Sequence, residues 1–210
     1  MGTIHLAHIL STLGTTEWNA RDRTRARVSG GLALTVYGGH TRDQGTPYIQ
    51  HPVAVVAVLR TELGVTHPDT LLLGLLHDAL EINPGAEALL TNQLGVAFSA
   101  RLRAITPDHR LERRRKEPGD EARWRAKTAG LSPEGLLVRF ADRIHNLRDL
   151  HRSPNRDRHA KFLRALADFH LPLAEAARPL SVHLEAAHTL LQAEYVRHQQ
   201  VMPVIPEVRP

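Results

Sequence analysis

The sequence contains no cysteine among its 210 residues. This absence excludes disulfide bonds and thiolate metal ligands, so any metal ion must be held by His and carboxylate side chains. Aromatic residues are also scarce, with four Phe, two Trp and three Tyr. The core must therefore consist mainly of Leu, Ala and Val, a composition typical of packed helices.

Long apolar runs and secretion signals are missing as well. No stretch is long and apolar enough to span a membrane, and the N-terminus lacks a basic segment followed by an apolar one. We therefore expect an intracellular, cytoplasmic protein without a membrane partner. The net charge of +5 favours an anionic ligand only weakly, because all but three of the 27 basic residues are Arg, as a coding bias would produce. Nothing resembles a helix that reads bases or a platform that stacks them, so we expect no nucleic-acid partner.

Residues 71–81, LLLGLLHDALE, are apolar on every side, so a helix here must be buried. His77 and Asp78 lie side by side within this stretch, although burial of ionisable groups is costly unless they are paired. Neighbouring side chains on a helix diverge by about 100° and can both reach one object between them, and Glu81 lies one turn after His77. Such a set suits a divalent metal ion and an activated water. A His–Asp pair held by local hydrogen bonds explains this stretch alone equally well.

Residues 38–52 are rich in Gly and Pro, which predicts a loop. The loop contains Arg42 and Tyr48 and ends at His51, where Pro52 presets the start of a helix over residues 53–63. His51 is then either a site residue at the helix entry or a solvent-facing one, and Arg42 is either a ligand contact or simply solvated.

Residues 132–152 begin with Ser-Pro-Glu, a helix start, and carry an apolar stripe. Asp142 stands among apolar neighbours, with Asn146 one turn later on the same face. Residues 108–129 are densely charged, which predicts either a solvated helical face with ion pairs or a rim of cations around a polyphosphate site.

No convincing strand is present, so the fold class is all-α: a helical bundle, with either a metal site or a hydrogen-bonded His–Asp pair between its helices. We predict three parts: residues 1–30 as an N-terminal helical extension, residues 31–200 as the domain, and residues 201–210 as an extended or disordered Pro-rich tail. Gly30–Gly31 is expected to separate the first two parts. Residues 157–199 should form two long helices broken near Pro172 and Pro179.

The order His51-Pro52, His77-Asp78, then Asp142 matches the H…HD…D arrangement of HD-domain metal-dependent phosphohydrolases. The flanking residues narrow the resemblance. Residues 42–52 resemble the RxxGxPYIxHP stretch of the RelA/SpoT hydrolase domain, residues 75–81 its LLHDxxE, and residues 140–150 its LADRLHNxRxL. Over residues 32–180 the chain resembles a stand-alone small alarmone hydrolase with an HD hydrolase domain.

This resemblance implies Mn²⁺-dependent hydrolysis of the 3′-pyrophosphate of guanosine tetra- or pentaphosphate, giving GDP or GTP and pyrophosphate. It implies one ion per chain, with Glu81 and Asn146 acting in catalysis, Glu81 by orienting or deprotonating the attacking water. The implied metal ligands are His51, His77, Asp78 and Asp142. The implied substrate contacts are Arg42, Tyr48, Asn146 and Arg148.

The chain departs from the family pattern at two places. Glu81-Ile82-Asn83 stands where the family has Glu-Asp-Thr, and Ile82 can neither take a proton nor orient water. Asp43-Gln44 replaces the usual Lys-Ser and removes a cation near the phosphates. Glu81 then carries the role alone, or the substrate differs. Two alternatives therefore stay open: an HD-type phosphohydrolase acting on another nucleotide, and a catalytically weakened alarmone-binding module. The sequence does not predict the oligomeric state.

Overall fold

The computed structural model describes residues 4–201, and these residues confirm the all-α prediction. Outside its helices, the described part contains one isolated antiparallel bridge, between Thr41 and Pro47. Apart from Val201, the expected Pro-rich tail lies outside the described residues. None of the described helices combines the length and the apolar character needed to cross a membrane.

The N-terminal part is built from α1 (Leu6–Leu13), a short 3₁₀ turn, and α2 (Ala20–Val36). The expected break at Gly30–Gly31 is wrong, because α2 continues through both glycines. A Cβ on Gly30 would lie 2.5 Å from Cδ1 of Leu6, so this glycine permits close packing of α1 on α2. Ile9 and Leu13 of α1 are buried in the same hydrophobic core as the rest of the molecule.

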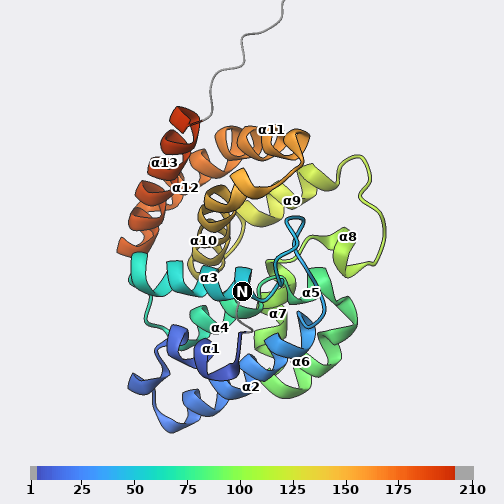
Figure 1. The fold of residues 1–210 in the computed structure, drawn as a ribbon, viewed down its shortest axis with the longest axis vertical. Helices are drawn as coiled ribbons and strands as arrows, with labels where there is room; N and C mark the ends of the chain where they lie inside the picture. The colour runs from blue at the N-terminus through green and yellow to red at the C-terminus, as the bar shows by residue number, and fades with distance from the viewer. Residues whose placement is uncertain (1–3, 202–210) are drawn as a thin grey trace, which may run out of the picture.

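The centre of the molecule consists of α3 (Gln50–Ala57), which continues as the π-helical turn η2 (Val58–Glu62), α4 (Pro68–Leu76), and α10 (Pro133–Asp149). α10 packs against α3 and α4 on one side and against α13 (Val182–Val201) on the other. Figure 1 shows these central helices between α1 and α2 at one end and α11 to α13 at the other.

Residues 71–81 are buried as predicted, but they are not one helix. α4 ends at Leu76, His77 and Asp78 form a turn, and α5 (Ala79–Ile82) follows. The His77 ring Nδ1 lies 2.8 Å from the carbonyl oxygen of Gly74, which a continuing α-helix would use for the N–H of Asp78. The side chain of His77 thus competes with the helix and interrupts it at the two residues of greatest interest.

The remaining helices largely follow their predicted breaks. Gly95 divides the 86–105 region, Ser132 caps α10, and the charged segment is split before Asp120. The expected break near Pro172 is wrong, because the helix continues from η5 into α12. The wider π-helical turn η5 ends two residues before Pro172 and accommodates its ring. The bounds are α6 (Glu87–Leu94), α7 (Val96–Ala104), α8 (Asp108–Leu111), α9 (Asp120–Ala129), α11 (Arg156–Ala165), η5 (Leu166–His170) and α12 (Leu171–Ala177).

Candidate active site

The four predicted metal ligands meet at one buried point. His51 comes from the first turn of α3, His77 and Asp78 from the turn between α4 and α5, and Asp142 from the middle of α10. His51 Nε2 lies 3.1 Å from Asp142 Oδ1 and 3.4 Å from Asp78 Oδ2. His77 Nε2 lies 3.2 Å from the same Asp78 oxygen and 3.7 Å from Asp142 Oδ1. All four residues are buried, so the solvent-facing alternative for His51 is wrong.

The imidazole rings are oriented by hydrogen bonds on their far sides. The contact to the Gly74 carbonyl places a proton on His77 Nδ1 and turns Nε2 toward the two carboxylates. His77 Nε2 is buried and makes no hydrogen bond to any described residue. His51 Nδ1 shares a hydrogen bond of 2.9 Å with Nδ1 of His145. A ring fixed through one nitrogen, with the other directed at a shared point, is the usual arrangement of a metal-binding histidine.

The two buried carboxylates also favour the presence of a cation at this point. Burial lowers the pKa of His77, but the neighbouring Asp78 and Asp142 outweigh that effect and raise it to about 10. Without a metal ion, a proton on His77 therefore helps to balance the carboxylates. One ligand atom from each of His51, His77 and Asp78 lies within 4.8 Å of the others. Imidazole nitrogens and carboxylate oxygens suit a divalent ion such as Mn²⁺, so the residues present fit a metal site.

A cavity of about 820 Å³ opens beside this cluster, and Glu81 lines it. Burial, followed by the charge of Asp78, raises the pKa of Glu81 to about 7, the range in which a carboxyl group can both take and give a proton at neutral pH. Ile82 instead packs against the hydrophobic core and does not line the cavity. Residue 82, where the family pattern has a second acid, therefore contributes no side chain to the cavity.

Three predicted substrate contacts lie in the same cavity. Arg42 Nη2 donates a 2.7 Å hydrogen bond to Asn146 Oδ1, and the Asn146 amide donates to Asp142 Oδ1. The Tyr48 hydroxyl donates to Asp78 Oδ2 at 2.8 Å. The glycine-rich loop is thus connected to Asp78 directly and to Asp142 through Asn146.

A profile of the HD domain matches residues 31–178, which is more than half of the chain. This chain belongs to the HD-domain family.

Individual relatives agree with this membership. The Escherichia coli bifunctional (p)ppGpp synthase/hydrolase SpoT is 27% identical over 173 residues, covering 81% of this chain and 24% of that protein. The zebrafish guanosine-3′,5′-bis(diphosphate) 3′-pyrophosphohydrolase MESH1 is 32% identical over 114 residues, covering 54% of this chain and 61% of that protein. The chain thus spans about a quarter of the first curated relatives and somewhat more than half of the smaller MESH1 proteins.

The fold has a solved counterpart. A structure described as a metazoan ortholog of SpoT that hydrolyses ppGpp and plays a role in starvation responses matches with a TM-score of 0.65. The match covers 93% of this chain and 98% of that one at 19% sequence identity. At that identity, the likeness shows a shared fold.

One predicted contact does not reach the cavity of the HD domain. Arg148 donates to both carboxylate oxygens of Glu62 at 2.7 Å and to Glu194 at 2.8 Å. It lies two residues after Asn146, so on α10 it points to nearly the opposite side. Arg148 connects α10 to η2 and α13, and the structure does not support its expected contact with a nucleotide.

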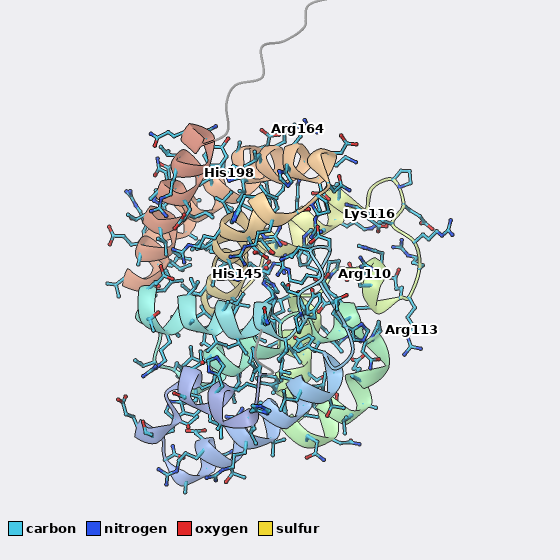
Figure 2. All side chains as sticks on the ribbon, viewed as in Figure 1. Arg110, Arg113, Lys116, His145, Arg164 and His198 are labelled. Atoms are coloured by element: carbon cyan, nitrogen blue, oxygen red, sulfur yellow. The ribbon has the colours of Figure 1, made fainter. Side chains whose placement is uncertain are left out.

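The charged segment contains the predicted ion pairs, whereas its role as a rim of cations around a polyphosphate site stays a prediction. Asp120 pairs with Arg114 and Arg123, and Glu121 pairs with Lys116 and Arg125, so most of its charges are balanced within the segment. Its cavity-lining basic residues are His109, Arg110 and Lys116. In Figure 2, Arg110 and Lys116 lie on the α8–α9 side of the molecule, while His145 lies near its centre.

Three residues of the site had no assigned role in the sequence. His145 orients His51, and burial and the nearby His51 lower the pKa of His145 to about 3, so its ring is neutral. Arg143 donates to Asp142 Oδ2 at 2.6 Å, and Arg139 Nη2 lies 3.5 Å from the same oxygen. For Arg139 and His145 the available signal was a spacing of three residues from Asp142 on α10, because positions three residues apart share a helix face.

Proposed function

We propose that this HD domain hydrolyses the 3′-pyrophosphate of guanosine tetra- or pentaphosphate with one Mn²⁺ per chain, releasing pyrophosphate and GDP or GTP. The observation that carries the proposal is the convergence of two imidazoles and two carboxylates on one buried point beside a large polar cavity. Relatives named as guanosine-3′,5′-bis(diphosphate) 3′-pyrophosphohydrolases support the choice of substrate.

His51, His77, Asp78 and Asp142 would hold the ion. When bound, a divalent ion acts as a Lewis acid, which lowers the pKa of water and balances charge developing on phosphoryl oxygens. The hydrogen bonds from Tyr48 to Asp78 and from Asn146 to Asp142 keep both carboxylates in place. This arrangement is set before the substrate arrives.

Glu81 is the residue that handles the proton in this proposal. It lines the cavity next to Asp78 and Asp142, and its pKa of about 7 lets it accept a proton from the attacking water and return it to a product. Ile82 offers no second acid, so Glu81 acts alone.

Arg42 and Asn146 form the nucleotide-binding side of the site. The planar guanidinium of Arg42 can lie along a base or pair with a phosphate, and its bond to Asn146 holds it at the cavity wall. The Tyr48 hydroxyl donates a hydrogen bond to Asp78, and Tyr48 also lines the cavity.

A second candidate is phosphohydrolysis of another nucleotide, favoured by the loop that carries Arg42. Asp43 accepts hydrogen bonds from Ser153 and Arg158, and Gln44 contacts Asp149. The chain thus has a carboxylate and an amide at the two positions where the family pattern provides Lys and Ser. The third alternative, a binding module without turnover, is disfavoured by the complete ligand set. We place the protein in the cytoplasm, with a small nucleotide as its partner.

The test is a substrate panel incubated with Mn²⁺-loaded protein and separated by nucleotide chromatography. The panel comprises guanosine tetraphosphate, guanosine pentaphosphate and ordinary nucleoside mono- and triphosphates, each with and without EDTA. The proposal expects GDP and pyrophosphate from guanosine tetraphosphate, with loss of both in EDTA. Faster turnover of another nucleotide would select the second candidate, and metal binding without any turnover would select the binding module.

A further inference from the structure

Two buried nitrogen atoms on the cavity wall lack a hydrogen-bond partner. Arg139 is 4% exposed and His170 is 5% exposed, and both line the cavity that contains Glu81 and Asp142. Arg139 Nε and His170 Nδ1 are buried, and neither bonds to any atom of the described residues. Buried polar atoms are nearly always paired in folded proteins, so two unpaired ones in side chains that line one cavity indicate a missing ligand.

The fold holds both side chains in place. Arg139 lies three residues before Asp142 on α10, with its guanidinium 5.0 Å from the centre of the Trp124 ring. His170 ends the π-helical turn η5, and its ring lies 4.9 Å from that of Phe169 in an edge-to-face arrangement. π-helical turns within helices are frequent at functional sites. Neither side chain is exposed to bulk water, which would otherwise provide a hydrogen-bond partner for its nitrogen.

The charges here identify the missing ligand as an anion. Burial, together with the guanidinium groups of Arg143 and Arg139, lowers the pKa of His170 to about 2, so its ring is neutral and carries one N–H. Arg139 is always charged and offers donors only. A cationic donor and a neutral one, next to a carboxylate that would hold a metal ion, match a phosphoryl oxygen.

We propose that Arg139 Nε–H and a ring N–H of His170 together bind a non-bridging oxygen of the phosphate that is removed. They make or break no covalent bond; they hold the phosphate beside the cluster and stabilise the charge on that oxygen. The identity of the group as a 3′-pyrophosphate rests on the proposed function. The binding of phosphate itself does not rest on the proposed function, because it requires only the two hydrogen-bond donors and the divalent ion.

The first test measures binding of inorganic phosphate to Mn²⁺-loaded protein through the ³¹P relaxation caused by the bound ion. His170→Phe keeps the ring volume and removes both nitrogens, and Arg139→Lys keeps the charge and removes the Nε donor. Loss of a hydrogen bond to a charged group predicts phosphate binding weakened about tenfold or more in each. His188→Phe on α13 and Arg164→Lys on α11 are matched controls away from the cavity, and both should bind as the wild type does.

A second measurement separates ligand binding from a structural role. The Mn²⁺ affinity and melting temperature of His170→Phe should stay close to those of the wild type, whereas its kcat/KM falls about as much as its phosphate affinity. His170→Asn retains a donor and should recover part of the loss. Unchanged phosphate binding in both His170→Phe and Arg139→Lys, or no phosphate binding by the wild type, would overturn this inference. Phosphate binding that depends on His170, without turnover of guanosine tetraphosphate, would sustain the inference and reject the proposed function.

Discussion

Two regions of the molecule are rich in ionisable side chains, and they differ in how their charges are balanced. In the segment 108–129 each buried or half-buried carboxylate has basic partners from the segment itself. Arg114 and the backbone N–H of Glu117 hold the pKa of Asp120 well below its usual range. In the buried cluster, Arg143 pairs with Asp142, but among the described residues Asp78 has only imidazole nitrogens as basic partners, and these carry a full charge only when protonated.

The difference shows why charge density alone does not locate a site. The segment has many more charges, but short-range pairs within it satisfy most of them, and such exposed pairs contribute little individually. The cluster has few charges, brought together from α3, the α4–α5 turn and α10, and the charge of Asp78 is balanced only by a proton on His77 or by a metal ion. Changes in the two regions should therefore differ greatly in their effects on activity.

Removal of one imidazole from the cluster should have the largest effect. His77→Ala deletes one of the two proposed ligand nitrogens, so turnover of guanosine tetraphosphate should fall about a thousandfold or more, which corresponds to ~4 kcal/mol. Steady-state rates with saturating Mn²⁺, together with circular dichroism to confirm folding, measure this. Full turnover by a folded variant would show that the site has been assigned wrongly.

Glu81→Gln should come next, because it keeps the shape of the side chain and removes its basicity. Loss of a positioned general base typically lowers kcat by about a hundredfold to ten-thousandfold. The affinity for Mn²⁺ should change little, since Glu81 is not among the proposed ligands. If kcat stayed within a few-fold of the wild type, another group would have to take the proton.

Arg42→Ala and Arg148→Ala form a matched pair. The sequence predicted a substrate contact for both residues, but in the structure only Arg42 lines the cavity. Arg42→Ala should raise KM about tenfold, because a charged hydrogen-bond donor leaves the cavity. Arg148→Ala should leave KM unchanged and lower the free energy of unfolding by about 1 kcal/mol, the upper range for half-exposed ion pairs. Initial-rate kinetics and urea denaturation measure the two. A raised KM in Arg148→Ala would restore its predicted role.

The smallest effect is expected in the charged segment. Lys127 bonds to the carbonyl of Thr106 and to Asp108, away from the cluster. Lys127→Ala should therefore cost about 0.5 kcal/mol of stability and leave kcat/KM as in the wild type. A large loss of activity with little loss of stability would contradict the view that these pairs are structural.

The sequence predicted the cluster well, because His and Asp are rare in apolar stretches and the three motifs occur in a known order. It missed the turn at His77–Asp78, since the weakest helix former in LLLGLLHDALE is Gly74, and α4 continues through it. That turn arises where the His77 ring takes the carbonyl of Gly74. Gly30 was misread for a related reason: its role is contact with Leu6, a tertiary effect that overrides the low helix propensity of glycine.

Residues that act through distant partners could not be predicted. The partners of Arg148 lie 86 and 46 residues away, so its pairing with Glu62 and Glu194 leaves no local pattern. His170 likewise reaches the cavity only because the fold brings η5 near Arg139 and Arg143 of α10. Family motifs identify residues with a common catalytic or binding role, whereas the roles of Arg148 and His170 depend on how separate helices pack together.

The central claim is that the buried cluster holds a divalent ion in place of a proton. Calorimetric titration of Mn²⁺ into metal-free protein at pH 7, in two buffers with different heats of ionisation, tests it most directly. Because the pKa of His77 is about 10 without an ion, binding of one Mn²⁺ per chain should release about one proton, and His77→Ala should abolish this binding. Absence of binding by the wild type, or equal binding by His77→Ala, would contradict the account.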